Sequence, residues 1–176
     1  MKIIAFAGSN SKNSINKKLA TYAASLFKNA DVTVLDLNDY AMPLFSVDLE
    51  KEIVQEPKAL EFLEKLSHAD LIILSLAENN GNYSAAFKNV FDWASRINKH
   101  VFQEKDMLLM ATSPGQRGGQ SVLEIAQNNL PRYGANIKAV FSLPVFNQNF
   151  DIESGKITEE IFDNQLREIV QNFNKA

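Results

Sequence analysis

Three short and almost entirely apolar segments constrain the fold of this chain more than any other feature. They are Lys2–Ala7 (KIIAFA), Asp70–Leu76 (DLIILSL) and Asp106–Ala111 (DMLLMA). Apolar runs of this length are typical of strands that are buried on both faces, as in a parallel sheet covered by helices. Two more segments with strand character, Asp31–Asp36 and Ala135–Leu143, bring the expected number of strands to five.

Amphipathic patterns follow the strands, with apolar residues at the spacing of a helix. We expect helices at residues 15–27, 57–67, 84–98, 121–130 and 159–173. In the last helix, six side chains should face the core: Ile161, Phe162, Leu166, Ile169, Val170 and Phe173. The polar stretch 147–156 predicts a surface loop. The long excursion 37–55 contains an apolar cluster, which is either functional, an interface, or packing over the sheet edge.

Alternation of strands and helices predicts an α/β fold with three layers, in which helices cover both faces of a parallel sheet. Five strands fit the flavodoxin-like order 2-1-3-4-5. A length of 176 residues predicts a single domain over residues 1–176. The chain enters its first strand directly, has no cysteine and has no long apolar run, so we expect a cytoplasmic protein. The net charge of -3 predicts neither a nucleic-acid nor a membrane partner.

The stretch Gly8–Asn16 (GSNSKNSIN) joins the first strand to the first helix and is rich in hydroxyl groups. Helix N-termini present free N–H groups and a partial positive charge, which favour phosphate. No acidic residue occurs between Gly8 and Ala30. Three lysines cluster at the helix start: Lys12, Lys17 and Lys18. The segment is therefore either a phosphate site or a polar turn in which Ser14 is an ordinary N-cap.

Three loops should share the carboxyl edge of the sheet, because they follow the first, third and fourth strands. They are residues 8–14, 77–82 and 112–119, and all are rich in Gly, Ser, Thr and Asn. Backbones with such small side chains can approach a ligand closely. A planar polar ligand with a phosphate tail would suit this edge, with the phosphate on the first loop and the ring between the other two.

Several other chemistries are disfavoured. His68 and His100 fall on the opposite edge of the predicted sheet, so neither is expected to act as a base, and no G-x-S-x-G motif is present. Glu78 is the only acid in the three loops, which is a poor basis for a metal site. The P-loop and G-x-G-x-x-G motifs are absent, as are the acids of a phosphoacceptor receiver after the first strand. We predict no catalytic side chain and no metal ligand.

The three loops together resemble the NAD(P)H-dependent FMN reductase family, which includes quinone, chromate and azo reductases. Residues 8–19 are similar to its G-S-x-R-x-x-S-x-N-x-x-L signature. Residues 78–96 resemble P-E-Y-N-x-x-x-P-G-x-L-K-N-x-x-D-W-x-S-R, and residues 113–119 resemble S-x-G-G-x-G-G. The resemblance extends over residues 1–143.

This resemblance implies an FMN cofactor, NADPH or NADH as electron donor, and a small-molecule electron acceptor such as a flavin or quinone. The FMN phosphate would be held by the first loop: Ser9, Ser11, Ser14, Ile15 and Asn16. The second loop would line the isoalloxazine: Ala77, Glu78, Asn79, Asn80 and Gly81. The third would lie below the ring: Ser113, Pro114 and Gly115. Hydride would pass from nicotinamide to flavin N5 and on to the acceptor, a reaction carried by the cofactor itself.

The sequence departs from the family pattern at four positions. Ser11 replaces an arginine and Asn79 replaces an aromatic residue, while Ala77 and Ser84 replace prolines. Loss of the arginine removes a charge-assisted contact of roughly 1.5–3 kcal/mol, so we expect weaker FMN binding. Lys12 or Lys17 could supply the missing charge. Arg117 is either a contact for a nicotinamide phosphate or a solvated loop residue.

Two other functions remain open at this point. One is a flavin-free or weakly flavin-binding interaction or sensor protein on the same scaffold, and the other is a non-enzymatic electron carrier of flavodoxin type. The family commonly uses the helix at 84–98 as a subunit interface, so the resemblance also implies a homodimer or homotetramer. Trp93 in this helix is predicted to be a core residue or a subunit contact rather than a flavin contact.

Overall fold

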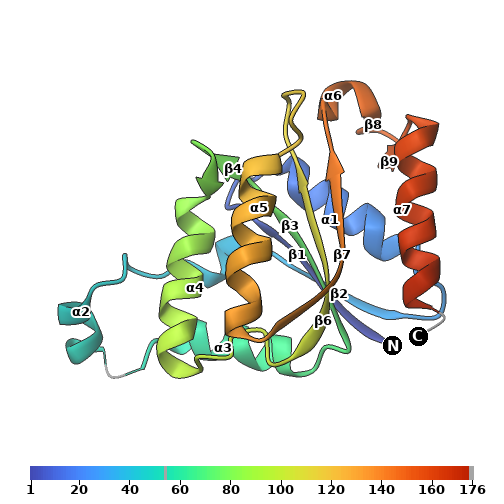
Figure 1. Ribbon diagram of the computed structural model, residues 1–176. Coiled ribbons are helices and arrows are strands. Elements are labelled where there is room, and N and C mark those ends of the chain that lie inside the picture. The colour runs from blue at the N-terminus through green and yellow to red at the C-terminus, as the bar shows by residue number, and fades with distance from the viewer. Residues whose placement is uncertain (54, 175–176) are drawn as a thin grey trace.

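A five-stranded parallel sheet forms the centre of the protein, and its strand order is β2-β1-β3-β6-β7. The computed structural model describes residues 1–53 and 55–174 (Figure 1). The strands are β1 (Lys2–Gly8), β2 (Asp31–Leu35), β3 (Leu71–Leu76), β6 (Lys105–Thr112) and β7 (Ala135–Leu143). Counted among the sheet strands alone, this is the predicted order 2-1-3-4-5, and the flavodoxin-like expectation is confirmed.

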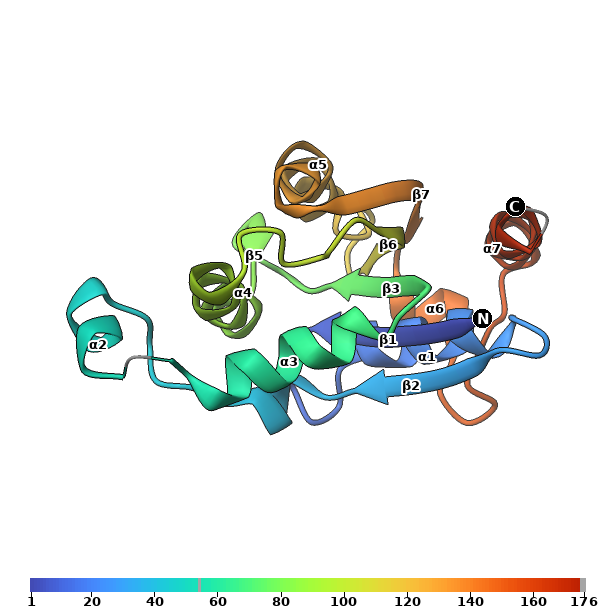
Figure 2. The same cartoon turned by 90° about the horizontal axis from the view of Figure 1, so that it is seen from below.

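Helices cover both faces of the sheet, as Figure 2 shows from below. The long helices are α1 (Ile15–Ser25), α3 (Pro57–Ser67), α4 (Ala85–Ile97), α5 (Gln120–Asn129) and α7 (Glu160–Phe173). The short ones are α2 (Val47–Glu52), α6 (Phe146–Asn149) and the 3-10 turns Leu37–Tyr40 and Leu130–Tyr133. Helices α3, α4 and α5 pack on one face, and α1 and α7 pack on the other.

Strand β1 shows why the apolar runs predicted this arrangement. Ile4 and Phe6 belong to the core shared with α3, α4 and α5, whereas Ile3 and Ala5 belong to the core shared with α1 and α7. Successive side chains of a strand point to opposite faces, so a strand between two helical layers must be apolar at every position.

Two expectations for the C-terminal part were wrong. The stretch expected to be a polar loop contains α6 and a small hairpin, β8 (Phe150–Asp151) with β9 (Lys156–Ile157). It is structured because Phe146 and Phe150 stack with ring centroids 4.7 Å apart and are both buried. Ile161 is 73% exposed rather than core-facing. The buried line of α7 contains Leu166 and Val170, four residues apart, and Ile161 lies off this line.

The excursion after β2 begins in the core, where Leu37 and Tyr40 are buried, and its 42–45 part packs on α4. The Asn89 side chain donates to the carbonyls of Met42 and Pro43, both at 3.1 Å, and accepts the Phe45 amide at 2.9 Å. The Trp93 indole N–H also donates to the Pro43 carbonyl at 2.8 Å. Trp93 is only 2% exposed, so it belongs to the core of its own subunit.

None of the helices in the part of the chain that the structure describes has the length and apolar character that crossing a bilayer requires.

Three buried tyrosines give a prediction for alkaline pH. Burial is the main cause that raises the pKa values of Tyr22, Tyr40 and Tyr83, each to about 12 from 10.0. The folded state therefore keeps these protons at pH values where the unfolded chain has lost them. Their contribution to stability is complete below pH 10 and falls as the pH rises towards 12. We expect the urea midpoint to decline steeply over this interval, and Tyr22→Phe to make the decline shallower. An unchanged slope in that variant would contradict the assignment of Tyr22.

Candidate functional site

The ends of three neighbouring strands place the three predicted loops at one edge of the sheet. Gly8 at the end of β1 pairs with Leu76 at the end of β3, and Leu76 pairs with Ala111 near the end of β6. The loops that follow these residues must therefore lie side by side (Figure 1). The loops thus share the carboxyl edge of the sheet, as the sequence predicted, and the ordering of strands at this point is typical of ligand sites in open α/β sheets.

The first loop ends in a capped helix start. The Ser14 hydroxyl accepts the Lys17 amide at 3.1 Å, and the Ser9 hydroxyl accepts the Ser11 amide at 3.2 Å. Ser14 is therefore an N-cap, as the simpler interpretation proposed. The amides of Ile15 and Asn16 donate to no protein group among the described residues. A helix N-terminus with two free amides has the donors that a phosphate needs.

The Asn16 side chain turns inward and joins the first loop to two strands. Its Oδ1 accepts the Ser75 hydroxyl at 2.7 Å and the Thr112 amide at 3.0 Å. Its Nδ2 donates to the Thr112 carbonyl at 3.1 Å. Asn16 is 3% exposed, so these bonds form in a desolvated environment where each is strong and hard to replace. The side chain therefore positions the loop, and only the backbone amide of Asn16 remains for a ligand.

The lysines near the first loop have different roles. Lys17 Nζ lies 2.5 Å from Asp36 Oδ2 at the end of β2. This hydrogen bond, helped by the Asn38 amide, lowers the pKa of the Asp36 carboxyl. Lys17 is therefore already paired and does not replace the arginine missing at position 11. Lys12 is exposed within the loop and remains the candidate for that charge.

The second loop is a tight β-hairpin formed by β4 (Glu78–Asn79) and β5 (Asn82–Tyr83). Asn80 and Gly81 form its turn, with φ angles of 52° and 75°. Positive φ at both central positions matches the hairpin twist, and Asn-Gly is the pair that adopts it most easily. The backbone of Glu78 and Asn79 is thus fixed in an extended conformation beside the crevice.

Two side chains attach this hairpin to its neighbours. Glu78 Oε2 accepts the Val122 amide at 3.0 Å in the first turn of α5, whose own N-cap residue, Gly119, supplies no side-chain hydrogen bond. The Ser84 hydroxyl caps α4 by accepting the Phe87 amide at 3.1 Å and donates to the Gly8 carbonyl at 2.7 Å. Serine at position 84 therefore links the hairpin to the first loop. The Glu78 carboxylate links it to the first turn of α5, which follows the third loop.

The third loop is held from the side of β7. The amides of Val145 and Phe146 donate to the carbonyls of Gly115 and Ser113, both at 3.0 Å. Val145 adopts a left-handed conformation with φ 46° and ψ 55°, which is unusual for a β-branched residue. The amides of Gly115 and Gln116 have no protein acceptor among the described residues, so both could donate to a ligand.

The structure brings all the predicted site residues to this edge, but they differ in their exposure to solvent. The most exposed are Ser11, Asn79, Asn80, Pro114 and Gly115. The buried ones are Ser14 and Asn16. The Ser14 hydroxyl accepts the Lys17 amide and keeps its own proton to donate, whereas the Asn16 side chain is used internally. Sequence reasoning missed Val145 and the pairing of Asp36 with Lys17. A β-branched residue directly after a proline gave no signal of a left-handed turn.

The two histidines lie away from this edge. His68 ends α3, and His100 precedes β6, so both lie at the amino edge as predicted. No cluster of three or more potential metal ligands occurs within residues 1–53 and 55–174. Arg117 is exposed and donates to the Ser121 hydroxyl at 2.9 Å, which fits a solvated loop residue.

A family model described as NADPH-dependent FMN reductase matches residues 1–148. The chain belongs to this family. It is 30% identical to an NADPH:quinone oxidoreductase of Arabidopsis thaliana over 97% of this chain and 88% of that protein. It is 28% identical to the NADH-dependent flavin reductase subunit 2 of Lactobacillus johnsonii, over 78% of this chain and 74% of that one.

The fold agrees with this family membership. The NAD(P)H:acceptor oxidoreductase FerB of Paracoccus denitrificans superimposes with a TM-score of 0.76 at 23% identity, covering 98% of this chain and 94% of FerB. FMN and a reduced nicotinamide nucleotide are the cofactor and donor of the family. The free amides at the start of α1 and in the third loop suit a phosphate and a polar ring, respectively, so the site fits FMN.

The Asn16 network predicts a large loss of stability for Asn16→Ala. The substitution leaves the Ser75 hydroxyl and the Thr112 backbone without their buried partners, which costs about 1–3 kcal/mol per unsatisfied group. We expect the urea-derived free energy of unfolding to fall by about 2–4 kcal/mol. Asn10→Ala, an exposed change in the same loop, is the matched control and should stay within about 0.5 kcal/mol of wild type. Equal stability of the two variants would show that the buried network is unimportant.

The Glu78 contact predicts a graded effect. Glu78→Ala removes the acceptor that caps α5, and we expect a loss of about 1 kcal/mol in unfolding free energy. Glu78→Gln retains an acceptor but loses the favourable interaction of a charge with the helix dipole, so its loss should be smaller. Hydrogen exchange at the Val122 amide should accelerate in the order wild type, Glu78→Gln, Glu78→Ala. Identical exchange in all three proteins would contradict the contact.

Proposed function

We propose that this protein is an FMN-dependent NAD(P)H oxidoreductase that passes reducing equivalents from the nicotinamide nucleotide to a quinone, a free flavin or a similar small acceptor. The observation that carries the proposal is the convergence of three loops at one sheet edge, fixed to each other by Asn16, Glu78 and Ser84. Family membership supports the cofactor and donor. The named relatives support the acceptor classes.

The phosphate end of the proposed site is the start of α1. Here the amides of Ile15 and Asn16 and the hydroxyl groups of Ser9, Ser11 and Ser14 would hold the FMN phosphate. Two amides at a helix N-terminus stabilise an anion both by hydrogen bonding and through the helix dipole. Exposed Lys12 would add a charge that partly replaces the arginine of the family pattern.

The ring end is formed by the hairpin and the third loop. We propose that the backbone of Ala77, Glu78, Asn79, Asn80 and Gly81 lines one edge of the isoalloxazine, with Ser113, Pro114 and Gly115 beneath it. FMN, when bound, supplies the hydride-accepting and hydride-donating chemistry. The protein orients the ring, donates amides to its polar edge, and leaves the opposite face open for donor and acceptor in turn. No side chain of this chain is required as acid or base.

The exposed apolar residues of the 41–53 segment support a homodimer or homotetramer. Leu44 is 80% exposed and Val47 is 59% exposed, and the segment projects from the body of the subunit (Figure 2). A second copy would cover these side chains, as adjacent apolar groups gain from leaving water. Sedimentation equilibrium at micromolar concentration should give at least a dimer, and Leu44→Glu should shift the protein towards monomer. A wild-type monomer would refute the assembly.

The experiment that tests the function uses purified protein supplied with FMN. An absorbance scan from 350 to 500 nm after gel filtration shows whether flavin stays bound, and steady-state assays with NADH or NADPH and a benzoquinone measure turnover. Retained flavin with turnover supports the proposal. Bound flavin without oxidation of either nucleotide would favour a flavodoxin-type carrier, and no flavin binding would favour an interaction or sensor protein.

The expected single domain, the cytoplasmic location and the lack of a nucleic-acid partner remain predictions.

The serine at position 11 gives a gain-of-function prediction. Ser11→Arg restores the charge of the family pattern at an exposed position next to the helix start. A charge-assisted hydrogen bond is worth about 1.5–3 kcal/mol, which corresponds to roughly ten- to hundredfold in affinity, and solvent screening favours the lower end. We expect the dissociation constant of FMN, measured by calorimetry, to fall about tenfold. Asn10→Arg adds the same charge one residue away and should have a much smaller effect. Equal gains would indicate a non-specific charge effect.

A further inference from the structure

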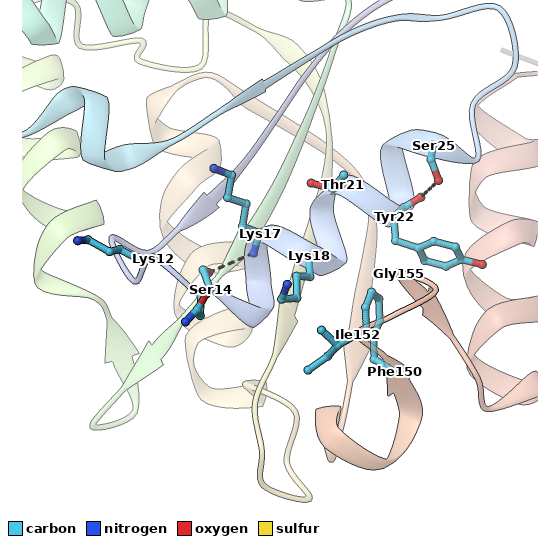
Figure 3. Close-up of a pocket in the computed structure, with 11 residues that line it drawn as sticks. Lys12, Ser14, Lys17, Lys18, Thr21, Tyr22, Ser25, Phe150, Ile152 and Gly155 are labelled. Carbon is cyan, nitrogen blue, oxygen red and sulfur yellow. Dashed lines mark hydrogen bonds between the residues drawn. The ribbon is translucent and has the colours of Figure 1, made fainter.

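A groove runs along the outer face of α1, and beyond its near end at the first loop it is not used by the proposed FMN site. It encloses about 440 Å³, which lies within the range of roughly 300–1,000 Å³ typical of small-molecule sites. One wall is the stripe of α1 that contains Lys18, Thr21, Tyr22 and Ser25, and the other is the β8–β9 hairpin (Figure 3). The hairpin is the part of the C-terminal region that was expected to be a polar surface loop.

The groove is continuous with the phosphate loop. Lys12, Asn13 and Ser14 line its near end, and Ser14 is the N-cap of the helix whose free amides are proposed to hold the FMN phosphate. A group attached to that phosphate and pointing away from the flavin ring would therefore enter the groove. FMN itself ends at the phosphate and would leave the groove empty.

The side chains of the walls suit a ligand that carries an anionic group followed by an aromatic group. Three of the lining side chains are lysines, and no acidic side chain lines the groove. Lys17 is paired with Asp36, whereas Lys12 and Lys18 form no ion pair with any described residue. Lys18 is therefore available for a second phosphate group, and Lys12, proposed above to lie beside the FMN phosphate, would lie between the two phosphates and be shared by them.

The far end of the groove is more apolar and is held rigidly. Phe150 lies against Tyr22 with ring centroids 6.1 Å apart in an edge-on arrangement. Ile152 is 56% exposed in the groove, although it is a large aliphatic residue. The Tyr22 hydroxyl is bound to Asp163 and accepts from Arg167 at 3.0 Å, which fixes this wall against α7. The hydroxyl groups of Thr21 and Ser25 remain beside it as potential partners of a sugar or base.

We propose that this groove binds the adenosine diphosphate half of flavin adenine dinucleotide, so that the protein accepts FAD in addition to FMN and holds it more tightly. The inference rests on the proposed function, because it needs the flavin phosphate at the start of α1. The second phosphate would lie between Lys12 and Lys18. The adenosine would lie against Ile152 and the Tyr22–Phe150 pair.

A nicotinamide dinucleotide fits this groove less well. Its nicotinamide must lie over the flavin ring to transfer hydride, and the ring end of the site is formed by the hairpin at 78–83 and the loop at 113–115. The groove starts at the opposite, phosphate end of the proposed site. In FAD the second phosphate is bonded directly to the flavin phosphate. It would therefore enter the groove, which begins at the loop proposed to hold the flavin phosphate.

Calorimetric titration of flavin-free protein with FMN, FAD and ADP tests the proposal. We expect FAD to bind at least fivefold more tightly than FMN, and ADP to compete with FAD. Lys18→Gln and Ile152→Asp change exposed or half-buried groove residues that take no part in the FMN site. Each should weaken FAD binding by about fivefold or more and change FMN binding by less than twofold. Lys28→Gln, an exposed charge loss beyond the end of α1, is the matched control and should alter neither.

The outcomes separate this proposal from the function on which it rests. Tighter FAD binding that is selectively lost in the two groove variants supports it. FMN binding with equal or weaker FAD binding overturns the groove assignment and leaves the reductase function intact. Equal losses for FMN and FAD in Lys18→Gln would also overturn it, because the lysine would then act on the shared phosphate. Binding of neither flavin overturns both.

Discussion

The geometry of this site depends on the hydrogen bonds of the buried Asn16 side-chain amide. One side chain forms three hydrogen bonds, to the Ser75 hydroxyl and to the backbone N–H and C=O of Thr112. It thereby fixes the first turn of α1 relative to the ends of β3 and β6. A buried polar group that satisfies all of its partners specifies one arrangement, because every displacement leaves a desolvated donor or acceptor unpaired.

Other hydrogen bonds hold the remaining parts of the site. Ser84 joins the hairpin to β1, Glu78 joins it to α5, and Val145 with Phe146 supports the third loop from the β7 side. Each loop is therefore attached to at least one other loop or strand end. The side chains that face inward hold the loops in place, and several backbone amides of the loops have no protein acceptor among the described residues. Such preorganisation is what a cofactor-dependent enzyme requires from its protein.

The sequence predicted the sheet, its order and the three loops, because these follow from apolar periodicity and from the geometry of parallel strands. It did not predict the roles of individual polar residues. Asn16 was expected to meet a phosphate, yet its side chain is directed into the sheet, a choice made by Ser75 and Thr112, which are far away in the chain. Lys17 was a candidate for the phosphate charge but has a partner in Asp36. The hairpin at 150–157 was missed because its two strands have only two residues each and depend on the stacking of Phe146 and Phe150.

The long-range nature of the Asn16 network has a consequence for how the protein folds. Asn16 meets Ser75 across 59 residues and Thr112 across 96 residues of sequence. Closing loops of this length costs entropy before the new contacts repay it, and structures dominated by such contacts form slowly. During synthesis, the first loop and α1 emerge long before β6 is available to receive them. The three loops therefore come together only after the fourth strand of the sheet has docked, and the residues that hold the third loop, Val145 and Phe146, are made later still. A nascent chain that ends before Thr112 cannot form this arrangement.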